Sequence, residues 1–227
     1  MCMLVAAVTK DFGVIATDSA KFDMEKQESI FDSQKLFHTT NNKYLVSFIG
    51  TPLYLANIDF SRFAMPLDGL SLYLKDYLKK MKPKVGAILK SEIGDKDEQE
   101  PNVCMFVLGM HKKIPTLAQY NVFHEFEPQY LWTKDAGIKF STIYYGGDTP
   151  KKNEVFKEST AYMEKKAAHY QSLTPGLVGE ILTRGIYKKA DLEEKEFGTK
   201  YAGGVVNVAF VRPEGLFTLS GVQPIPV

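Results

Sequence analysis

The feature of this sequence that most constrains its fold is the order in which strand-like and helix-like segments alternate. Short apolar runs rich in β-branched and aromatic residues fill residues 2–50 and again 102–147. The first two runs are almost continuously apolar, which is typical of strands covered on both faces. A final pair of runs within 203–221 is joined at "PEG" and predicts a hairpin. The predicted strands of the two blocks are residues 2–9, 13–19, 34–40, 43–50, 102–110, 115–122, 129–133 and 140–147.

Between these blocks apolar residues recur at helical spacing. Within 52–92 one stripe comprises Leu67, Leu70, Leu74, Tyr77, Leu78 and Met81. Pro83 predicts that this helix kinks or ends, with a second helical segment beyond it. The polar stretch 94–102 predicts a surface loop. Two more helices are predicted near 150–171 and 174–194, the latter with Thr174 as its N-cap.

The resulting order is a strand block, two helices, a strand block, two helices and a hairpin. This order favours an α+β fold, a four-layer αββα sandwich in which two antiparallel sheets pack face to face and a helix pair covers each outer surface. At 227 residues and 44% hydrophobic content, the sequence predicts a single domain over residues 1–227.

Composition narrows the classes of partner. The formal net charge is +1, so no overall field attracts nucleic acid or an anionic membrane. The basic stretch 75–84 is interpreted as a solvated helix face, with a binding patch as the alternative. Two cysteines make no disulfide framework and four scattered histidines show no ligand spacing, so we expect a cytoplasmic protein without metal or cofactor.

One of the two cysteines, Cys2, directly follows Met1. Removal of a methionine that precedes a small residue would leave Cys2 with a free α-amine and a thiol on the same residue. An α-amine titrates near pH 7.7–8.0, so it can take up the thiol proton close to neutral pH. Cys2 is therefore either a candidate nucleophile or an accident of sequence, and position alone does not decide. Cys104, within an apolar run, is interpreted as a buried thiol.

Further motifs accompany Cys2 at the start of the first predicted strand. They are "GVIATDSA" with Asp18, "SQKLF" with Lys35, "SFIGT" with Gly50, and the late "YAGGVVNVAFVRPEG". Together these stretches resemble the N-terminal nucleophile (Ntn) hydrolases of the proteasome β-subunit type, which include the HslV peptidase and the ancestral β-subunits. Lys35 stands one residue further along than the family spacing.

The resemblance implies a peptidase or amidase that forms an acyl-enzyme on Cys2. In that mechanism the Cys2 thiol is the nucleophile and its α-amine the base. Lys35 lowers the pKa of both groups, Asp18 holds Lys35, and the Gly50 N–H stabilises the oxyanion. The resemblance also implies a peptide or amide substrate and a homo-oligomer, a ring or a stack, and leaves open whether an ATPase acts with it.

The spacing between the first two strands predicts their register. If "DFG" is a three-residue loop, Lys10 pairs with Val14 and Cys2 lies opposite Phe22. Asp18 then lies opposite Ala6, too far along the strand for direct contact with Cys2. The chain Cys2–Lys35–Asp18 is the arrangement this register favours.

The chain departs from the family pattern at several polar positions. Ser19, Gly147, Asp148 and Thr149 are expected to line the site, although Gly147 replaces a family serine. Thr199 and Ala202 stand where the family carries Asp and Ser. Two alternatives therefore remain beside the peptidase: an acylase, amidase or acyl transferase of the same fold, and a catalytically silent structural or assembly subunit.

Overall fold

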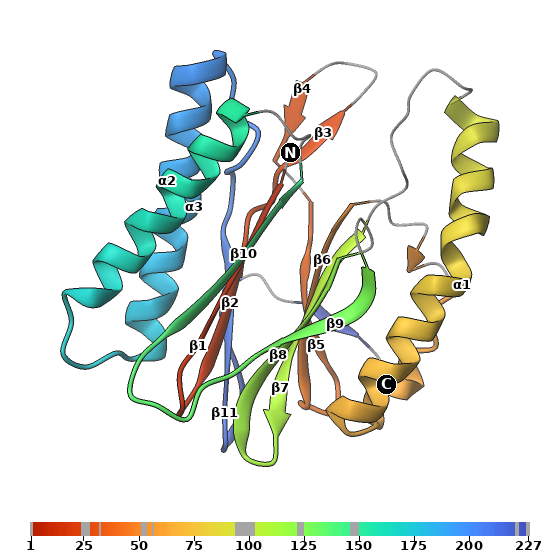
Figure 1. Ribbon diagram of the computed structural model, residues 1–227, viewed down its shortest axis with the longest axis horizontal. Coiled ribbons are helices and arrows are strands. Elements are labelled where there is room, and N and C mark those ends of the chain that lie inside the picture. The colour runs from red at the N-terminus through yellow and green to blue at the C-terminus, as the bar shows by residue number, and fades with distance from the viewer. Residues whose placement is uncertain are drawn as a thin grey trace.

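The computed structural model has an α+β fold built on two large sheets (Figure 1). It describes residues 2–23, 28–31, 33–50, 54–55, 57–93, 103–121, 125–145, 150–220 and 223–225. Within these residues the chain forms three α-helices. The predicted polar loop at 94–102 lies outside the described residues. No helix of the described part is both long and apolar enough to cross a membrane.

The first sheet is antiparallel and places the earliest strands at its centre. Its order is β10-β1-β2-β11-β12, so β1 and β2 are flanked by strands from the second half of the chain. The strands are β1 (Cys2–Val8), β2 (Gly13–Thr17), β10 (Lys139–Tyr145), β11 (Asn207–Arg212) and β12 (Gly215–Ser220). β11 and β12 form the hairpin predicted around "PEG".

The second sheet follows the order β13-β5-β6-β7-β8-β9. Its strands are β5 (Leu36–Thr39), β6 (Tyr44–Gly50), β7 (Val103–His111), β8 (Ile114–Asn121), β9 (Glu125–Leu131) and β13 (Gln223–Ile225). β13 pairs with β5 in parallel, so this sheet carries one parallel edge. A separate small hairpin joins β3 (Lys21–Asp23) to β4 (Glu28–Ile30). Neither β13 nor the β3–β4 hairpin is predicted by the sequence pattern.

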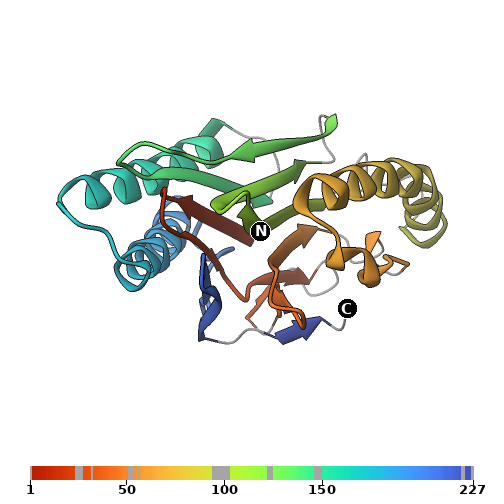
Figure 2. The same ribbon diagram turned by 90° about the horizontal axis from the view of Figure 1, so that it is seen from below.

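Side-chain alternation along β1 explains why its sequence is continuously apolar. Met3, Val5 and Ala7 pack against α2 (Pro150–Ala168) and α3 (Pro175–Phe197). Leu4, Ala6 and Val8 pack into a second cluster shared with the other sheet. A third cluster lies between that other sheet, α1 (Leu67–Ile93) and the short 3-10 helix η2 (Phe60–Ala64). Figures 1 and 2 show α2 and α3 on one side of the sheets and α1 on the other.

The prediction that a helix ends at Pro83 is wrong. α1 runs continuously from Leu67 to Ile93 with Pro83 inside it. The apolar stripe continues across the proline through Met81 and Val85, both buried against the second sheet, while Pro83 itself is exposed. Tertiary packing therefore carries the helix past the residue that local propensity disfavours.

The predicted register of β1 and β2 is also wrong. Val8 pairs with Gly13, and the Thr9 N–H donates to the Phe12 carbonyl at 2.8 Å, which closes a tighter turn than the predicted loop. The Thr9 hydroxyl oxygen accepts the Phe12 N–H at 3.0 Å. The Phe12 side chain is buried in the cluster under α2 and α3, so Phe12 packs with the strand residues and is not part of an exposed loop.

The corrected register moves Asp18 towards the beginning of β1. The Asp18 N–H donates to the Met3 carbonyl at 3.4 Å, so Asp18 lies beside Met3 and not beside Ala6. Continuing the observed pairing of Leu4 with Thr17, Cys2 does not face Phe22. A backbone hydrogen bond from Met3 also favours the charged form of the Asp18 carboxyl, so the carboxylate lies close to the residue that follows Cys2 in the chain.

Candidate functional site

Among the described residues, Asp18, Ser19, Lys35 and Gly50 lie at one end of the two sheets, the end where β1 begins. β2 ends just before Asp18, and Asp18 contacts Lys35, which immediately precedes β5. The Lys35 carbonyl accepts the N–H of Phe48 at 3.3 Å, and Gly50 ends β6 two residues later. Figure 1 shows this end at the top, where N marks the start of β1.

An ion pair between Asp18 and Lys35 joins the two sheets at this end. The Lys35 ammonium donates to Asp18 Oδ1 at 2.6 Å and also to the Ala20 carbonyl. Both side chains are buried, Asp18 completely. The contact between these two residues, which the resemblance implied, is therefore present.

The environment of Asp18 makes its charge dependent on its partners. Burial raises the pKa of the Asp18 carboxyl, while the Lys35 ammonium and its hydrogen bond act in the opposite direction. Lys189, on α3, also favours the charged carboxylate, more weakly. Without Lys35, Asp18 is either a neutral acid or an unpaired buried charge.

A glycine-rich turn after α3 covers the other side of Asp18. Gly203 N–H donates to Asp18 Oδ2 at 3.2 Å, so each oxygen of the carboxylate has a donor. Gly203 and Gly204 adopt φ values of 125° and 74°, which favour glycine. A Cβ on Gly204 would lie 2.4 Å from Ser19 Oγ, so the close approach also requires glycine. This Gly-Gly pair belongs to the late motif "YAGGVVNVAFVRPEG", but the motif does not predict its contact with Asp18.

Ser19, predicted to line the site, has hydrogen-bond partners on two loops. Its hydroxyl donates to the Phe31 carbonyl at 3.1 Å and accepts the Val205 N–H at 3.0 Å. Its backbone N–H donates to the Gly203 carbonyl at 3.2 Å. Ser19 is buried, so these contacts assign it to holding the turn.

Gly50 ends β6 in a conformation with φ 111° and pairs with Val103 of β7. This φ lies in the region that favours glycine, so a side chain here would strain the strand end. The position places a backbone N–H at the same end of the sheet as Lys35.

Several predicted residues are described in part or not at all. Cys2 is described through its backbone, which pairs with Tyr145 of β10. Gly147, Asp148 and Thr149 lie outside the described residues. Their roles stay predictions.

A second buried ion pair, which the sequence analysis missed, lies on α3 next to this turn. The Lys189 ammonium donates to Glu193 Oε1, and both side chains are almost fully buried. Glu193 Oε2 accepts the N–H groups of Tyr201 at 3.0 Å and Ala202 at 2.8 Å. The signal was available: Lys189 and Glu193 continue the buried stripe of Leu182 and Ile186 at helical spacing.

Cys104 is buried between the sheets, as predicted. Burial raises the pKa of its thiol to about 12. A thiol held protonated at neutral pH is a poor nucleophile, so Cys104 is unsuited to nucleophilic chemistry. Among the described residues, no group of three or more His, Cys, Asp or Glu side chains is arranged to hold a metal ion.

Comparison with known proteins adds no identification. No protein-family model matches the chain, and no curated protein matches its sequence.

Proposed function

We propose that this chain is an N-terminal cysteine amidohydrolase, a cytoplasmic peptidase that acts through an acyl-enzyme on Cys2. The observation that carries the proposal is the buried Asp18–Lys35 ion pair at the end of the sheets where β1 begins. Burying two charges has a large desolvation cost, and such a pair is weak evidence for stability alone. Its position beside the first strand supports a role in the chemistry of Cys2.

The proposed fold is the four-layer αββα sandwich of the Ntn hydrolases. Three apolar clusters support it: one between the sheets, one under α2 and α3, and one under α1. On the α1 side a single long helix and η2 take the place of the predicted helix pair. The homo-oligomer implied by the resemblance belongs to the same proposal.

The chemistry begins once Met1 has been removed. The Cys2 α-amine takes the thiol proton, and the sulfur attacks the carbonyl carbon of the substrate amide. The Gly50 N–H donates to the resulting oxyanion. When the C–N bond breaks, the α-ammonium returns the proton to the leaving amine, which leaves a thioester on Cys2. Water then attacks the thioester carbonyl and gives one proton to the α-amine. When the C–S bond breaks, the α-ammonium returns that proton to the sulfur, which releases the carboxylic acid and restores the Cys2 thiol.

In this mechanism Lys35 supplies positive charge near the thiol and the α-amine, which favours the thiolate. Asp18 holds the Lys35 ammonium at 2.6 Å and is itself held by Gly203. The carboxylate of Glu193 binds the turn at Ala202, where the family has a serine, so a different polar group serves this turn. The departures at Thr199 and Ala202 are therefore compatible with an ordered site.

The first test is the intact mass of the purified protein, followed by treatment with an electrophile such as a peptide β-lactone. We expect Met1 to be absent and one adduct to form on Cys2. Cys2→Ala removes the adduct, whereas Cys104→Ala, the matched control, keeps it. Quantitative retention of Met1 would contradict the mechanism, because the α-amine would not be on Cys2, and would favour a silent assembly subunit.

A substrate panel then separates the enzymatic alternatives. Peptide amides and small acyl amides are offered with water alone or with an added amine acceptor. Cleavage of peptides supports the peptidase. Cleavage of small acyl amides alone, or transfer of the acyl group to the added amine, favours the acylase or transferase alternative.

A further inference from the structure

Two buried carboxylates from different elements bind three successive amides of one turn. The N–H groups of Tyr201 and Ala202 donate to Glu193, at 3.0 and 2.8 Å. The next N–H, of Gly203, donates to Asp18 at 3.2 Å. The peptide link between Ala202 and Gly203 therefore connects the ion pair of α3 to the ion pair of the candidate site.

The Lys189–Glu193 pair is not what packing alone would select. Both side chains lie on the face of α3 that packs against the first sheet, where Ile186 and Ala190 are also buried. Apolar residues at these two positions would fill the same space without the cost of desolvating two charges. What an apolar residue does not supply is an acceptor for two backbone N–H groups of a buried turn.

The turn needs such an anchor because two of its residues have positive φ values and because Gly203 makes two hydrogen bonds to the candidate site. Gly203 and Gly204 have positive φ values, and the Gly203 carbonyl accepts the Ser19 N–H at 3.2 Å. Ser19 follows Asp18 in the chain. A displaced turn would therefore move a hydrogen-bond partner of Asp18 and a partner of its neighbour together.

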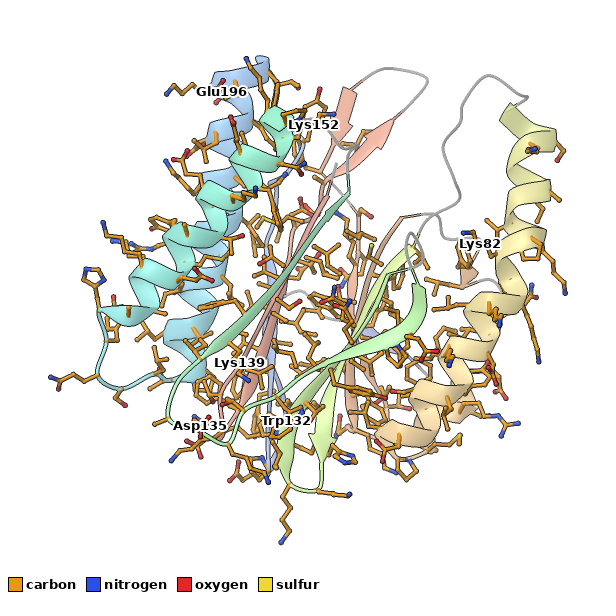
Figure 3. All side chains as sticks on the ribbon, in the orientation of Figure 1. Lys82, Trp132, Asp135, Lys139, Lys152 and Glu196 are labelled. Carbon is orange, nitrogen blue, oxygen red and sulfur yellow. The ribbon has the colours of Figure 1, made fainter. Side chains whose placement is uncertain are left out.

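We propose that Glu193 is a positioning residue for the candidate site: it fixes the turn at residues 201–203 so that Gly203 holds Asp18, which in turn holds Lys35. Lys189 keeps the Glu193 carboxylate paired and aimed at the turn. Figure 3 labels Glu196, one turn beyond Glu193, at the same end of the molecule as the start of β1 in Figure 1. The catalytic consequence rests on the proposed function, whereas the effect on Gly203 does not.

The test compares Glu193→Gln and the double variant Lys189→Gln/Glu193→Gln with a matched control on the same helix. The control is Glu180→Gln/Arg184→Gln, which removes an exposed pair of the same spacing, at 2.5 Å. The measurements are amide hydrogen exchange at Gly203, kcat and KM for a cleaved peptide amide, and the pH profile of Cys2 alkylation.

We expect hydrogen exchange at the Gly203 amide to accelerate roughly tenfold in Glu193→Gln. This is the effect expected when the hydrogen bond from Gly203 to Asp18 loses the support of the anchored turn. We expect kcat to fall by roughly a hundredfold with little change in KM, because the reacting groups are misplaced while substrate contacts remain. The pH profile of Cys2 alkylation shifts to higher pH as Lys35 loses its fixed place. The control changes none of these.

Equal Gly203 exchange in Glu193→Gln and in the control would overturn the proposal. If the single variant does not fold, the double variant, which leaves no unpaired charge, takes its place. Hydrogen exchange in the wild-type protein is a further test. Rapid exchange of the amides at 201–203 in the wild type would also overturn the proposal. If the wild type shows no Cys2-dependent turnover while Gly203 exchange still depends on Glu193, the proposed function fails and the positioning role stands.

Discussion

The two ends of the sheets differ in how they hold charge. Four charged side chains among the described residues are buried, Asp18, Lys35, Lys189 and Glu193, and all lie near the end where β1 begins. At the opposite end, the half-buried His111 contacts the exposed Asp68 at 3.5 Å, and Lys134 lies over the half-exposed ring of Trp132. Figure 3 shows Trp132, Asp135 and Lys139 at that end.

This difference indicates which end of the molecule requires a fixed arrangement of its side chains. Exposed charges adapt at little cost, and removing one changes stability slightly. Buried charges with defined partners hold one arrangement, and breaking a pair leaves an uncompensated group. The end around Asp18 is therefore built for fixed geometry, whereas the far end tolerates change.

The largest expected effect comes from breaking the buried pair. Lys35→Met leaves Asp18 without its ammonium partner and should lower the free energy of unfolding by about 3–5 kcal/mol at pH 7. Because burial raises the pKa of the Asp18 carboxyl, the variant binds a proton more tightly when folded than when unfolded. Its stability therefore falls as pH rises, and the deficit shrinks as pH is lowered towards 5.

Urea unfolding at several pH values measures both effects. The double variant Asp18→Asn/Lys35→Met, which leaves no buried charge unpaired, should recover much of the loss. A Lys35→Met protein as stable as wild type at pH 7 would show that the pair is not held as described.

The second prediction concerns the core between the sheets, which separates the two ends. Since the pKa of the Cys104 thiol is raised to about 12, the folded protein keeps this proton after the unfolded chain, with an ordinary pKa of 9.0, has lost it. Stability should therefore fall from about pH 9 to about pH 12, with Cys104 contributing about 1.4 kcal/mol per pH unit.

Cys104→Val removes this contribution while keeping an apolar side chain. We compare the free energy of unfolding of the variant with that of wild type at two pH values. The difference in favour of the variant should be about 2–3 kcal/mol larger at pH 11 than at pH 8. Guanidinium unfolding of both proteins at the two pH values checks this. Parallel pH profiles would argue against a buried, protonated thiol.

The third prediction uses two glycines of similar backbone conformation. Gly204 and Gly198 have φ values of 74° and 71°. A Cβ at Gly204 would meet Ser19 Oγ at 2.4 Å and Phe31 Cβ at 2.7 Å, whereas nothing lies within 4 Å of one at Gly198. We expect Gly204→Ala to cost about 2–3 kcal/mol and Gly198→Ala about 1 kcal/mol.

Thermal or urea unfolding of the two variants isolates the steric part, because the φ penalty is common to both. Equal losses would mean that the turn over Ser19 moves aside freely, which would also weaken the positioning role of Glu193.

The smallest effect is expected at the far end. Asp68→Asn removes the exposed contact with His111 and should change the free energy of unfolding by no more than about 0.5 kcal/mol. Urea unfolding at low and high salt measures it. A loss comparable with that of Lys35→Met would erase the contrast between the two ends.

Much of the fold follows from local pattern. The apolar strands predicted at 2–9 and 13–19 correspond to β1 and β2, which end at Val8 and Thr17. The N-cap at Thr174 and the hairpin at "PEG" match the structure. Thr174 Oγ1 accepts the Leu177 N–H at 3.3 Å, as the N-cap prediction requires. These features succeed because each depends on neighbours in the chain.

The errors arose where distant contacts override local signals. Pro83 did not end α1, because the apolar stripe beyond it packs on the second sheet. The first hairpin closed at Thr9 and Phe12, since Phe12 is buried under α2 and α3. The Glu193 anchor was missed because its partners at 201 and 202 lie beyond the end of its own helix.

The sequence by itself determined the alternation of strand blocks with helices and the buried character of the first strands and of Cys104. Its resemblance to the Ntn hydrolases selected Asp18, Lys35 and Gly50 as candidates. The alternation and the burial depend on periodicity and composition, whereas the candidates depend on motifs shared with that family. Only the tertiary structure decided that Asp18 lies beside Met3, that both its oxygens have donors, and that a second ion pair holds the turn above it. Burial and hydrogen-bond geometry join residues 18, 35, 193 and 203, and no local pattern encodes contacts across such separations.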